Sequence, residues 1–236
     1  MCKYKAIIFD MDGVLFDTEL FYYKRRERFL KQHGITIDHL PMNFFIGGNM
    51  KQVWKSVLGD QYDTWDIDKL QQDYSRYKED NPLPYKDLIF QDCKRVIEKL
   101  HHKGYLLGLA SSSTRHDIML ALESFNLDTY FKVILSGEEF SESKPNPAIY
   151  NRAAELLDIP KQQILIVEDS EKGITAGIAA GIAAGIAAGI AAGIAAGIAA
   201  GIDVWAIEDK YFGMNQSQAN VLVSDLSQFF VKLDNY

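Results

Sequence analysis

The sequence is poor in cysteine and has no excess of basic residues. Its 236 residues include two cysteines, Cys2 and Cys93, which lie far apart and have no metal-binding or redox spacing. This scarcity argues against a disulfide-stabilised secreted fold and predicts a reducing, cytoplasmic compartment. Lysine and arginine number 25 against 32 aspartates and glutamates, and the net charge of −7 argues against nucleic acid as a partner. The first five residues lead directly into an apolar run, so we expect no signal peptide.

The most informative segment runs from Asp10 to Glu19 and reads D-M-D-G-V-L-F-D-T-E. It follows Ala6-Ile7-Ile8-Phe9, a short apolar run typical of a buried strand. Asp10 and Asp12 leave the end of that strand on the same side, and Gly13 permits a sharp turn. Ligands bind at the carboxyl ends of strands in open α/β sheets, so one acid is placed to attack a substrate and the other to transfer a proton. For a bare D-x-D pair, an acidic turn that caps a helix is the alternative.

The rest of the chain shows a helical segment followed by alternating strands and helices. The helical segment has patterns over residues 20–33, 53–58 and 70–78 and no convincing strand before Asn81-Pro82-Leu83-Pro84. The alternating part is predicted to contain strands over 106–110, 133–135, 164–167 and 204–207, and helices over 93–102, 116–125 and 147–157. Such alternation specifies an α/β fold with a parallel sheet and right-handed crossovers.

Serine and lysine residues in the alternating part are candidates for binding phosphate. Ser111 and Ser112 follow the strand over 106–110, where a hydroxyl and the next helix N-terminus can donate to a phosphate oxygen. Helix capping is the alternative for such serines. Lys144 lies in the rigid segment S-K-P-N-P, which can hold an ammonium group at a fixed point beside phosphoryl charge. An ordinary surface lysine is the alternative for Lys144.

An acidic pair, Glu168 and Asp169, follows the strand over 164–167. These acids could cap the next helix. Across the sheet from Asp10, however, they would form an oxygen-rich site for a small hard cation. Mg²⁺ is the expected metal because it binds through one or two carboxylates together with water and substrate phosphate.

Together these motifs and their order resemble the haloacid dehalogenase (HAD) superfamily of phosphotransferases. The resemblance covers nearly the whole chain and is greatest to the helical-cap branch, which holds sugar-phosphate phosphatases and β-phosphoglucomutases. It implies a Rossmann-like parallel-sheet α/β core, residues 1–16 and 85–236, and an inserted helical cap, residues 17–84. The cap would supply specificity and exclude water.

The resemblance also implies a Mg²⁺-dependent reaction through an aspartyl-phosphate. In this reaction Asp10 is the nucleophile and Asp12 the general acid and base, while Ser111 and Lys144 hold the phosphoryl oxygens. The residues expected to contact the substrate or its phosphate are Gly13, Ser112 and Lys78. The expected metal ligands are Asp10, Glu168, Asp169 and the backbone carbonyl of Asp12.

Two positions separate a phosphatase from a mutase in this branch. The β-phosphoglucomutases carry a histidine where this chain has Tyr22, and an arginine in the cap loop where this chain has Gly47-Gly48-Asn49-Met50. Lys78 resembles a mutase cap lysine that faces the substrate, although Lys78, Arg25 and Lys51 could equally be solvated helix charges. We therefore expect a phosphatase that hydrolyses a small phosphorylated metabolite such as a sugar phosphate. A β-phosphoglucomutase-type mutase and a non-catalytic binding protein on the same fold are the alternatives.

A tandem repeat of Gly-Ile-Ala-Ala occupies residues 177–200 and closes with Gly201-Ile202. Compared with the family pattern, about 20 residues are surplus. We predict an extended Ala/Gly/Ile helix, and no membrane span because the flanks belong to an α/β core. Twenty extra helical residues add about 30 Å, so the segment either folds back as a hairpin or carries residues 203–236 to a second chain as a domain swap. A homo-oligomer through this helix is thus an expected partner, beside the phosphorylated metabolite.

Overall fold

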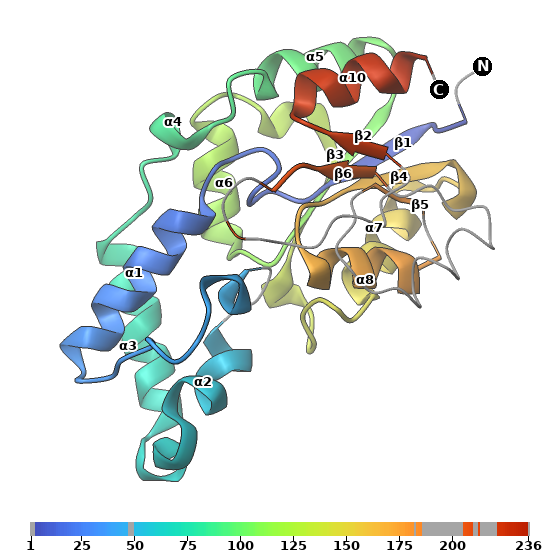
Figure 1. The fold of residues 1–236 in the computed structure, drawn as a ribbon. Helices are drawn as coiled ribbons and strands as arrows, with labels where there is room; N and C mark the ends of the chain where they lie inside the picture. The colour runs from blue at the N-terminus through green and yellow to red at the C-terminus, as the bar shows by residue number, and fades with distance from the viewer. Residues whose placement is uncertain are drawn as a thin grey trace.

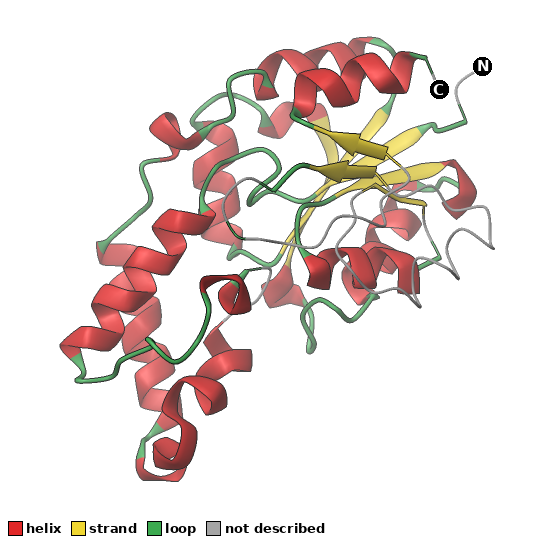
Figure 2. Ribbon diagram, viewed as in Figure 1, coloured by secondary structure: helices red, strands yellow, loops and turns green. Residues whose placement is uncertain are grey.

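The computed structural model describes residues 3–46, 50–181, 183–185, 205–209, 212 and 221–235. A parallel sheet with helices on both faces lies beside a separate group of helices (Figures 1 and 2). The sheet has five strands in the order β3-β2-β1-β4-β5. Their bounds are β1 (Ala6–Phe9), β2 (Leu106–Ser111), β3 (Phe131–Ser136), β4 (Ile164–Val167) and β5 (Ala183–Gly185). The α/β class with a parallel sheet is confirmed.

The central strand β1 aligns the carboxyl ends of its two neighbours, β2 and β4. All four of its residues are buried, as expected for a strand covered on both faces. Phe9 lies opposite Leu109 of β2 on one side and opposite Val167 of β4 on the other. Because the three strands are parallel and in this register, the residues that follow them emerge at one edge.

Two layers of helices cover the sheet (Figure 1). One face packs against α5 (Cys93–His102), α6 (Arg115–Glu123) and α10 (Leu226–Asp234). The other face packs mainly against α7 (Ala148–Leu157) and α8 (Glu171–Ala179). The alternation of side chains along β1 produces this division, since Ile7 and Phe9 face the first layer and Ala6 and Ile8 the second.

The helical segment predicted before Pro84 is confirmed. It contains α1 (Glu19–Gln32), α2 (Met50–Leu58), α3 (Ile67–Asp80) and two short 3₁₀ helices, η1 (Met42–Phe45) and η2 (Gly59–Thr64). These elements share a hydrophobic cluster of their own, which includes Phe29, Trp54 and Tyr74. The boundaries proposed for the cap, residues 17–84, stay a prediction.

Short connections complete the described chain. They are α4 (Tyr85–Leu88) and three 3₁₀ helices, η3 (Asp128–Tyr130), η4 (Gly137–Glu139) and η5 (Lys161–Gln163). None of the helices in the described ranges is long and apolar enough to cross a membrane.

The extended repeat helix is contradicted after residue 179, since within the described part of the repeat residues 177–179 are helical and residues 183–185 are not. Helix α8 ends at Ala179, and Gly181 has a φ of +65°, a left-handed conformation that favours glycine and ends helices. Ala183–Gly185 then forms β5, which pairs in parallel with β4. A glycine in every fourth position costs a helix about 1 kcal/mol each, whereas the edge of β4 offers unpaired backbone groups. Residues 186–204 lie outside the described residues.

The strand predicted over 204–207 is present as β6 (Trp205–Ile207), but it does not pair with a strand of the five-stranded sheet. It pairs in parallel with β7 (Val221–Val223) in a two-stranded sheet, because β5 already occupies the edge beside β4. Helix α10 then packs on the core of the same chain, where the Phe229 ring lies 6.2 Å from the Phe9 ring. Exchange of residues 203–236 between two chains stays a prediction.

Candidate active site

The Asp10 carboxylate lies at the carboxyl end of the central strand and is held by a buried lysine. Lys144 Nζ is 2.6 Å from Asp10 Oδ1, 2.6 Å from Glu168 Oε1 and 2.9 Å from the carbonyl oxygen of Ala110. Lys144 is 2 % exposed, so these three acceptors replace its hydration. Burial lowers the pKa of Lys144, but Asp10 and Glu168 outweigh it and hold the pKa well above the ordinary value. The residue is therefore a fixed ammonium group, as its Pro-flanked segment predicted.

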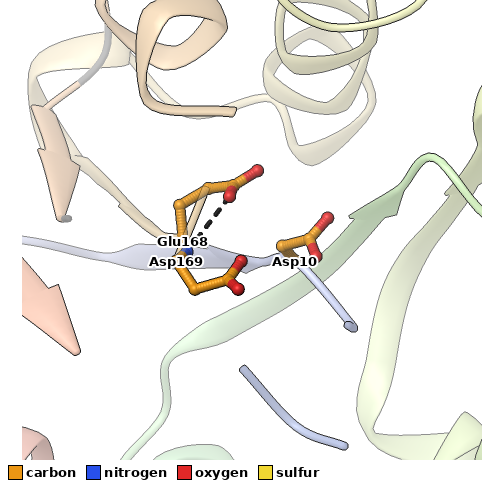
Figure 3. Close-up of side chains that lie close together, drawn as sticks. All are labelled: Asp10, Glu168 and Asp169. Atoms are coloured by element: carbon orange, nitrogen blue, oxygen red, sulfur yellow. Dashed lines mark hydrogen bonds between the residues drawn. The ribbon is translucent and has the colours of Figure 1, made fainter. Parts of the chain in front are cut away.

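Three carboxylates gather at this edge of the sheet. Asp10, Glu168 and Asp169 each offer an oxygen within 4.8 Å of the others. Figure 3 shows the carboxylates of Asp10 and Asp169 facing the same space, with that of Glu168 beside them. Burial raises the pKa of Asp169 well above its usual range, and repulsion from Glu168 raises it further. Burial likewise raises the pKa of Asp10, against the attraction of Lys144.

Two glycines make room for these acids. Gly13 has a φ of +75°, and a Cβ at this position would lie 1.9 Å from Asp169 Oδ2. At Gly173, on α8, a Cβ would lie 1.8 Å from Glu168 Oε1. Gly13 therefore acts by leaving space for an acid. Gly173, four residues after Asp169, leaves space for an acid in the same way, a role that no local sequence pattern indicates.

The Asp12 carboxylate is oriented by three hydroxyl groups, one at the start of α1 and two at the end of β2. Thr18 Oγ1 donates to Asp12 Oδ1 at 2.6 Å, while Ser113 Oγ at 2.7 Å and Ser111 Oγ at 3.3 Å donate to Asp12 Oδ2. The backbone N–H of Asp12 donates to Asp10 Oδ2 at 3.0 Å. Burial raises the pKa of Asp12, and the hydrogen bonds from Thr18 and Ser113 oppose the rise. A carboxyl group of this kind can hold a proton and release it to a neighbour.

A cavity of about 980 Å³ opens over the acids and reaches the helical segment. Six of the residues predicted for the site line it: Asp10, Asp12, Ser112, Lys144, Asp169 and Lys78. The remaining three, Gly13, Ser111 and Glu168, are not among the lining residues. The Ser111 hydroxyl is fully buried and donates to Asp12, so its role as a direct phosphate donor stays a prediction.

The structure adds site residues that the sequence analysis did not identify. Thr18 stands inside the motif quoted for Asp10 and Asp12, Ser113 directly follows Ser112, and both donate to Asp12. Tyr150, on α7, donates to Glu168 Oε1 at 2.6 Å, and nothing in its local sequence signals this contact. Arg25 and Arg26, on α1, are buried cavity-lining cations, although Arg25 carried the alternative of a solvated helix charge.

A small hard cation fits the residues present. All of the donors are carboxylate oxygens, the ligand type that Mg²⁺ prefers. Lys144 contacts Asp10 and Glu168 but not Asp169, and the repulsion that raises the pKa of Asp169 is relieved by positive charge. A metal would therefore be held by Asp10 and Asp169, with Glu168 adjacent. The backbone carbonyl of Asp12 stays a predicted ligand.

Comparison with known proteins decides the family. The sequence profile of the haloacid dehalogenase-like hydrolases matches residues 7–187, which is most of the chain. This protein belongs to the haloacid dehalogenase-like hydrolases. The resemblance stated from the motifs is thereby confirmed, as is the expectation of an enzyme of the HAD type.

Relatives of this HAD protein include two named phosphatases. The phosphorylated carbohydrates phosphatase of Thermotoga maritima is 28 % identical over 174 residues, which cover 73 % of this chain and 79 % of that protein. The phosphoglycolate phosphatase of Aquifex aeolicus is 29 % identical over 174 residues, covering 73 % and 79 % respectively. Among solved structures, a β-phosphoglucomutase from Clostridium difficile superposes with a TM-score of 0.75 at 19 % identity, over 98 % of this chain and 97 % of that one. That likeness shows the fold alone.

Proposed function

We propose that this protein is a Mg²⁺-dependent phosphatase that hydrolyses a small phosphorylated metabolite, such as a sugar phosphate, through an aspartyl-phosphate on Asp10. The observation that carries the proposal is the position of Asp10 at the cavity, 2.6 Å from the Lys144 ammonium and bonded to the backbone N–H of Asp12. The phosphatases among the relatives support the same reaction class.

The reaction requires one nucleophile and one proton carrier. A carboxylate oxygen of Asp10 forms a bond to phosphorus as the bond from phosphorus to the substrate oxygen breaks, and Asp12 gives its proton to that leaving oxygen. Asp12 then takes a proton from water, the water oxygen bonds to phosphorus, and the bond to Asp10 breaks to release inorganic phosphate. The raised pKa of Asp12, which burial causes, suits a group that must begin protonated. Proton transfer of this kind contributes about 10²–10⁴ in rate.

Positive charge must offset the phosphoryl oxygens throughout. Lys144 supplies a fixed ammonium beside Asp10. A Mg²⁺ ion held by Asp10 and Asp169 would add charge neutralisation at the same oxygens, the main contribution in phosphoryl transfer. Ser112 lines the cavity, where its backbone and hydroxyl can orient the phosphate.

Tyr22 favours hydrolysis over the mutase alternative. Its hydroxyl lies 3.0 Å from Ser113 Oγ and 3.3 Å from the hydroxyl of Tyr85. Burial raises the pKa of Tyr22 well above the usual range, so the phenol stays neutral and offers no base to a sugar hydroxyl. A mutase must bind the sugar in a second reactive orientation and keep water away from its phospho-enzyme. A phosphatase instead needs water, which accepts the phosphoryl group.

The test is phosphate release by the full-length protein from p-nitrophenyl phosphate and a panel of small phosphorylated metabolites. We expect activity with Mg²⁺, its loss on adding EDTA, and turnover reduced by about 10³-fold or more in Asp10→Asn. Asp17→Asn is the matched control, because Asp17 is an exposed acid of the same motif. Equal turnover in Asp10→Asn and Asp17→Asn would refute the assignment of the nucleophile. Conversion of β-glucose 1-phosphate to glucose 6-phosphate with little free phosphate would establish the mutase instead.

A further inference from the structure

Arg25 is a buried cation that lacks a partner for part of its guanidinium group. The residue lies on α1, is 5 % exposed and lines the cavity that contains Asp10. Its Nη1 atom donates to the carbonyl oxygen of Asn81 at 3.1 Å, at the end of α3. Its Nε and Nη2 atoms are buried, and no described residue accepts a hydrogen bond from them. A buried charged donor in this state costs free energy, so an acceptor from outside the chain is expected.

The two unpaired atoms belong to one edge of the guanidinium group. Nε–H and one Nη2–H point in the same direction, and together they form the side-on fork that binds two oxygens of a carboxylate or phosphate. Nη1 lies outside this edge, so its contact with Asn81 orients the group without using the fork. The Tyr22 ring, 5.0 Å from the guanidinium carbon, further fixes the orientation of Arg25.

A second cation, Lys78, lines the same cavity as Arg25. It lies on α3, and no described carboxylate forms an ion pair with either residue. Burial lowers the pKa of Lys78, attraction from Asp117 opposes this shift, and repulsion from Arg25 adds to it. The acid Asp117 lines the cavity too, but its carboxylate already accepts a hydrogen bond from the Thr114 hydroxyl, and its backbone N–H donates to Thr114 Oγ1 at the start of α6.

A short series of contacts connects Arg25 to the reacting carboxylates. Arg25 lies over the Tyr22 ring, the Tyr22 hydroxyl contacts Ser113, and Ser113 donates to Asp12. The carboxylates with their fixed lysine and the partly unsatisfied Arg25 therefore belong to one cavity. A phosphate monoester bound at Asp10 would extend its other end toward Arg25.

We propose that the Nε/Nη2 edge of Arg25, with the Lys78 ammonium beside it, binds a second anionic group on the substrate. The inference rests on the proposed phosphatase function and narrows it to phosphate monoesters that carry a carboxylate or a second phosphate. Either group offers two oxygens to the fork. Neutral sugar or aryl groups would leave the fork without an acceptor.

Selectivity for a charged end is the property to measure. The substrates are 2-phosphoglycolate and a hexose bisphosphate, compared with ethyl phosphate, a hexose monophosphate and p-nitrophenyl phosphate. We expect kcat/KM to favour at least one of the two anion-bearing substrates over its neutral counterpart by tenfold or more. Arg25→Gln should lower kcat/KM for the preferred anion-bearing substrate at least tenfold more than it lowers kcat/KM for p-nitrophenyl phosphate. Arg76→Gln is the control, because Arg76 is an exposed cation on the same cavity.

A second measurement separates recognition from folding. Arg25→Lys keeps a positive charge but removes the fork, and we expect it to lose most of the preference while its melting temperature stays close to that of the parent. Binding of the anion-bearing and neutral substrates is also measured by calorimetry in Asp10→Asn, with and without Arg25→Lys, so that no turnover is needed.

The outcomes distinguish the two proposals. Preference for 2-phosphoglycolate alone identifies a carboxylate ligand, and preference for the bisphosphate alone a phosphate ligand. Hydrolysis of every substrate at similar kcat/KM, with no effect of Arg25→Lys on binding, would overturn the second anionic site and leave the phosphatase intact. Absence of any hydrolysis would instead refute the proposed function.

Discussion

Replacement of Glu19 by glutamine should stabilise the metal-free protein, and more so at high pH. Glu19 is the first residue of α1, is 8 % exposed and lines the cavity. Burial raises the pKa of Glu19 from 4.5 to about 8, with repulsion from Asp12 adding to the rise and attraction from Arg26 opposing it. In the unfolded chain the group recovers its ordinary pKa of 4.5.

The difference between the pKa of Glu19 in the folded and unfolded states makes the free energy of unfolding depend on pH. A carboxyl group whose pKa is higher in the folded state binds protons more tightly there, so it costs stability as the pH rises above 4.5 and the cost levels off above about 8. One unit of pKa difference corresponds to about 1.4 kcal/mol, so the cost is under about 1 kcal/mol at pH 5 and up to about 4 kcal/mol at pH 8. Neighbouring acids titrate as well and share this cost. We therefore expect Glu19→Gln to gain about 2–4 kcal/mol at pH 8, or about 5–15 °C in melting temperature.

The assay is thermal unfolding in EDTA between pH 5 and pH 9, followed by calorimetry. Glu27→Gln is the matched control, because Glu27 is an exposed acid on the same helix. Addition of Mg²⁺ should reduce the gain, since a cation at Asp10 and Asp169 stabilises the ionised form of nearby acids. A gain that is equal at pH 5 and pH 8, or a Glu19→Gln curve that overlies the Glu27→Gln curve, would refute the reasoning.

Three further predictions concern space, orientation and the repeat. Gly13→Ala should lower Mg²⁺ affinity at least tenfold in a metal titration, because its Cβ would lie 1.9 Å from Asp169 Oδ2. Gly34 has a similar positive φ but open space around it, so the control Gly34→Ala should leave the affinity unchanged. Tyr22→Phe should lower kcat about fivefold without raising KM, because it removes one hydrogen bond, worth about 1 kcal/mol, to Ser113, which orients Asp12. An unchanged kcat would contradict this role of Tyr22. Deletion of one repeat unit, residues 187–190, should leave kcat within twofold of the parent, because β5 and every residue that lines the cavity precede the deletion. A large loss of kcat would show that the repeat supports the site directly.

Much of the core could be predicted because its signals are local. Ala6–Phe9, Cys93–His102 and Ile164–Val167 are observed with the predicted bounds, since apolar runs and helical periodicity identify elements without knowledge of their partners. The placement of Asp10 beside Glu168 and Asp169 follows from the same source, because residues that succeed parallel strands meet at one edge.

The features that were not predicted depend on tertiary contacts. Ala183–Gly185 has the composition of a weak helix, and only the free edge of β4 makes it a strand. Tyr150 and Arg25 resemble ordinary helix residues until the fold buries them against Glu168 and the cavity. Burial and pairing of this kind are properties of the packed molecule, which no local pattern records.

The central claim is that Asp10 carries the phosphoryl group, and chemical trapping tests it most directly. Borohydride reduces an acyl phosphate to an alcohol, so an aspartyl-phosphate at Asp10 would be converted to homoserine. The full-length protein is mixed with Mg²⁺ and a substrate that it hydrolyses, quenched with borohydride, digested and analysed by mass spectrometry. The account predicts homoserine at position 10 only when substrate is present, and none at Asp12 or Asp17. Conversion at another acid, or sustained hydrolysis with no conversion at Asp10 under any quench time, would contradict it.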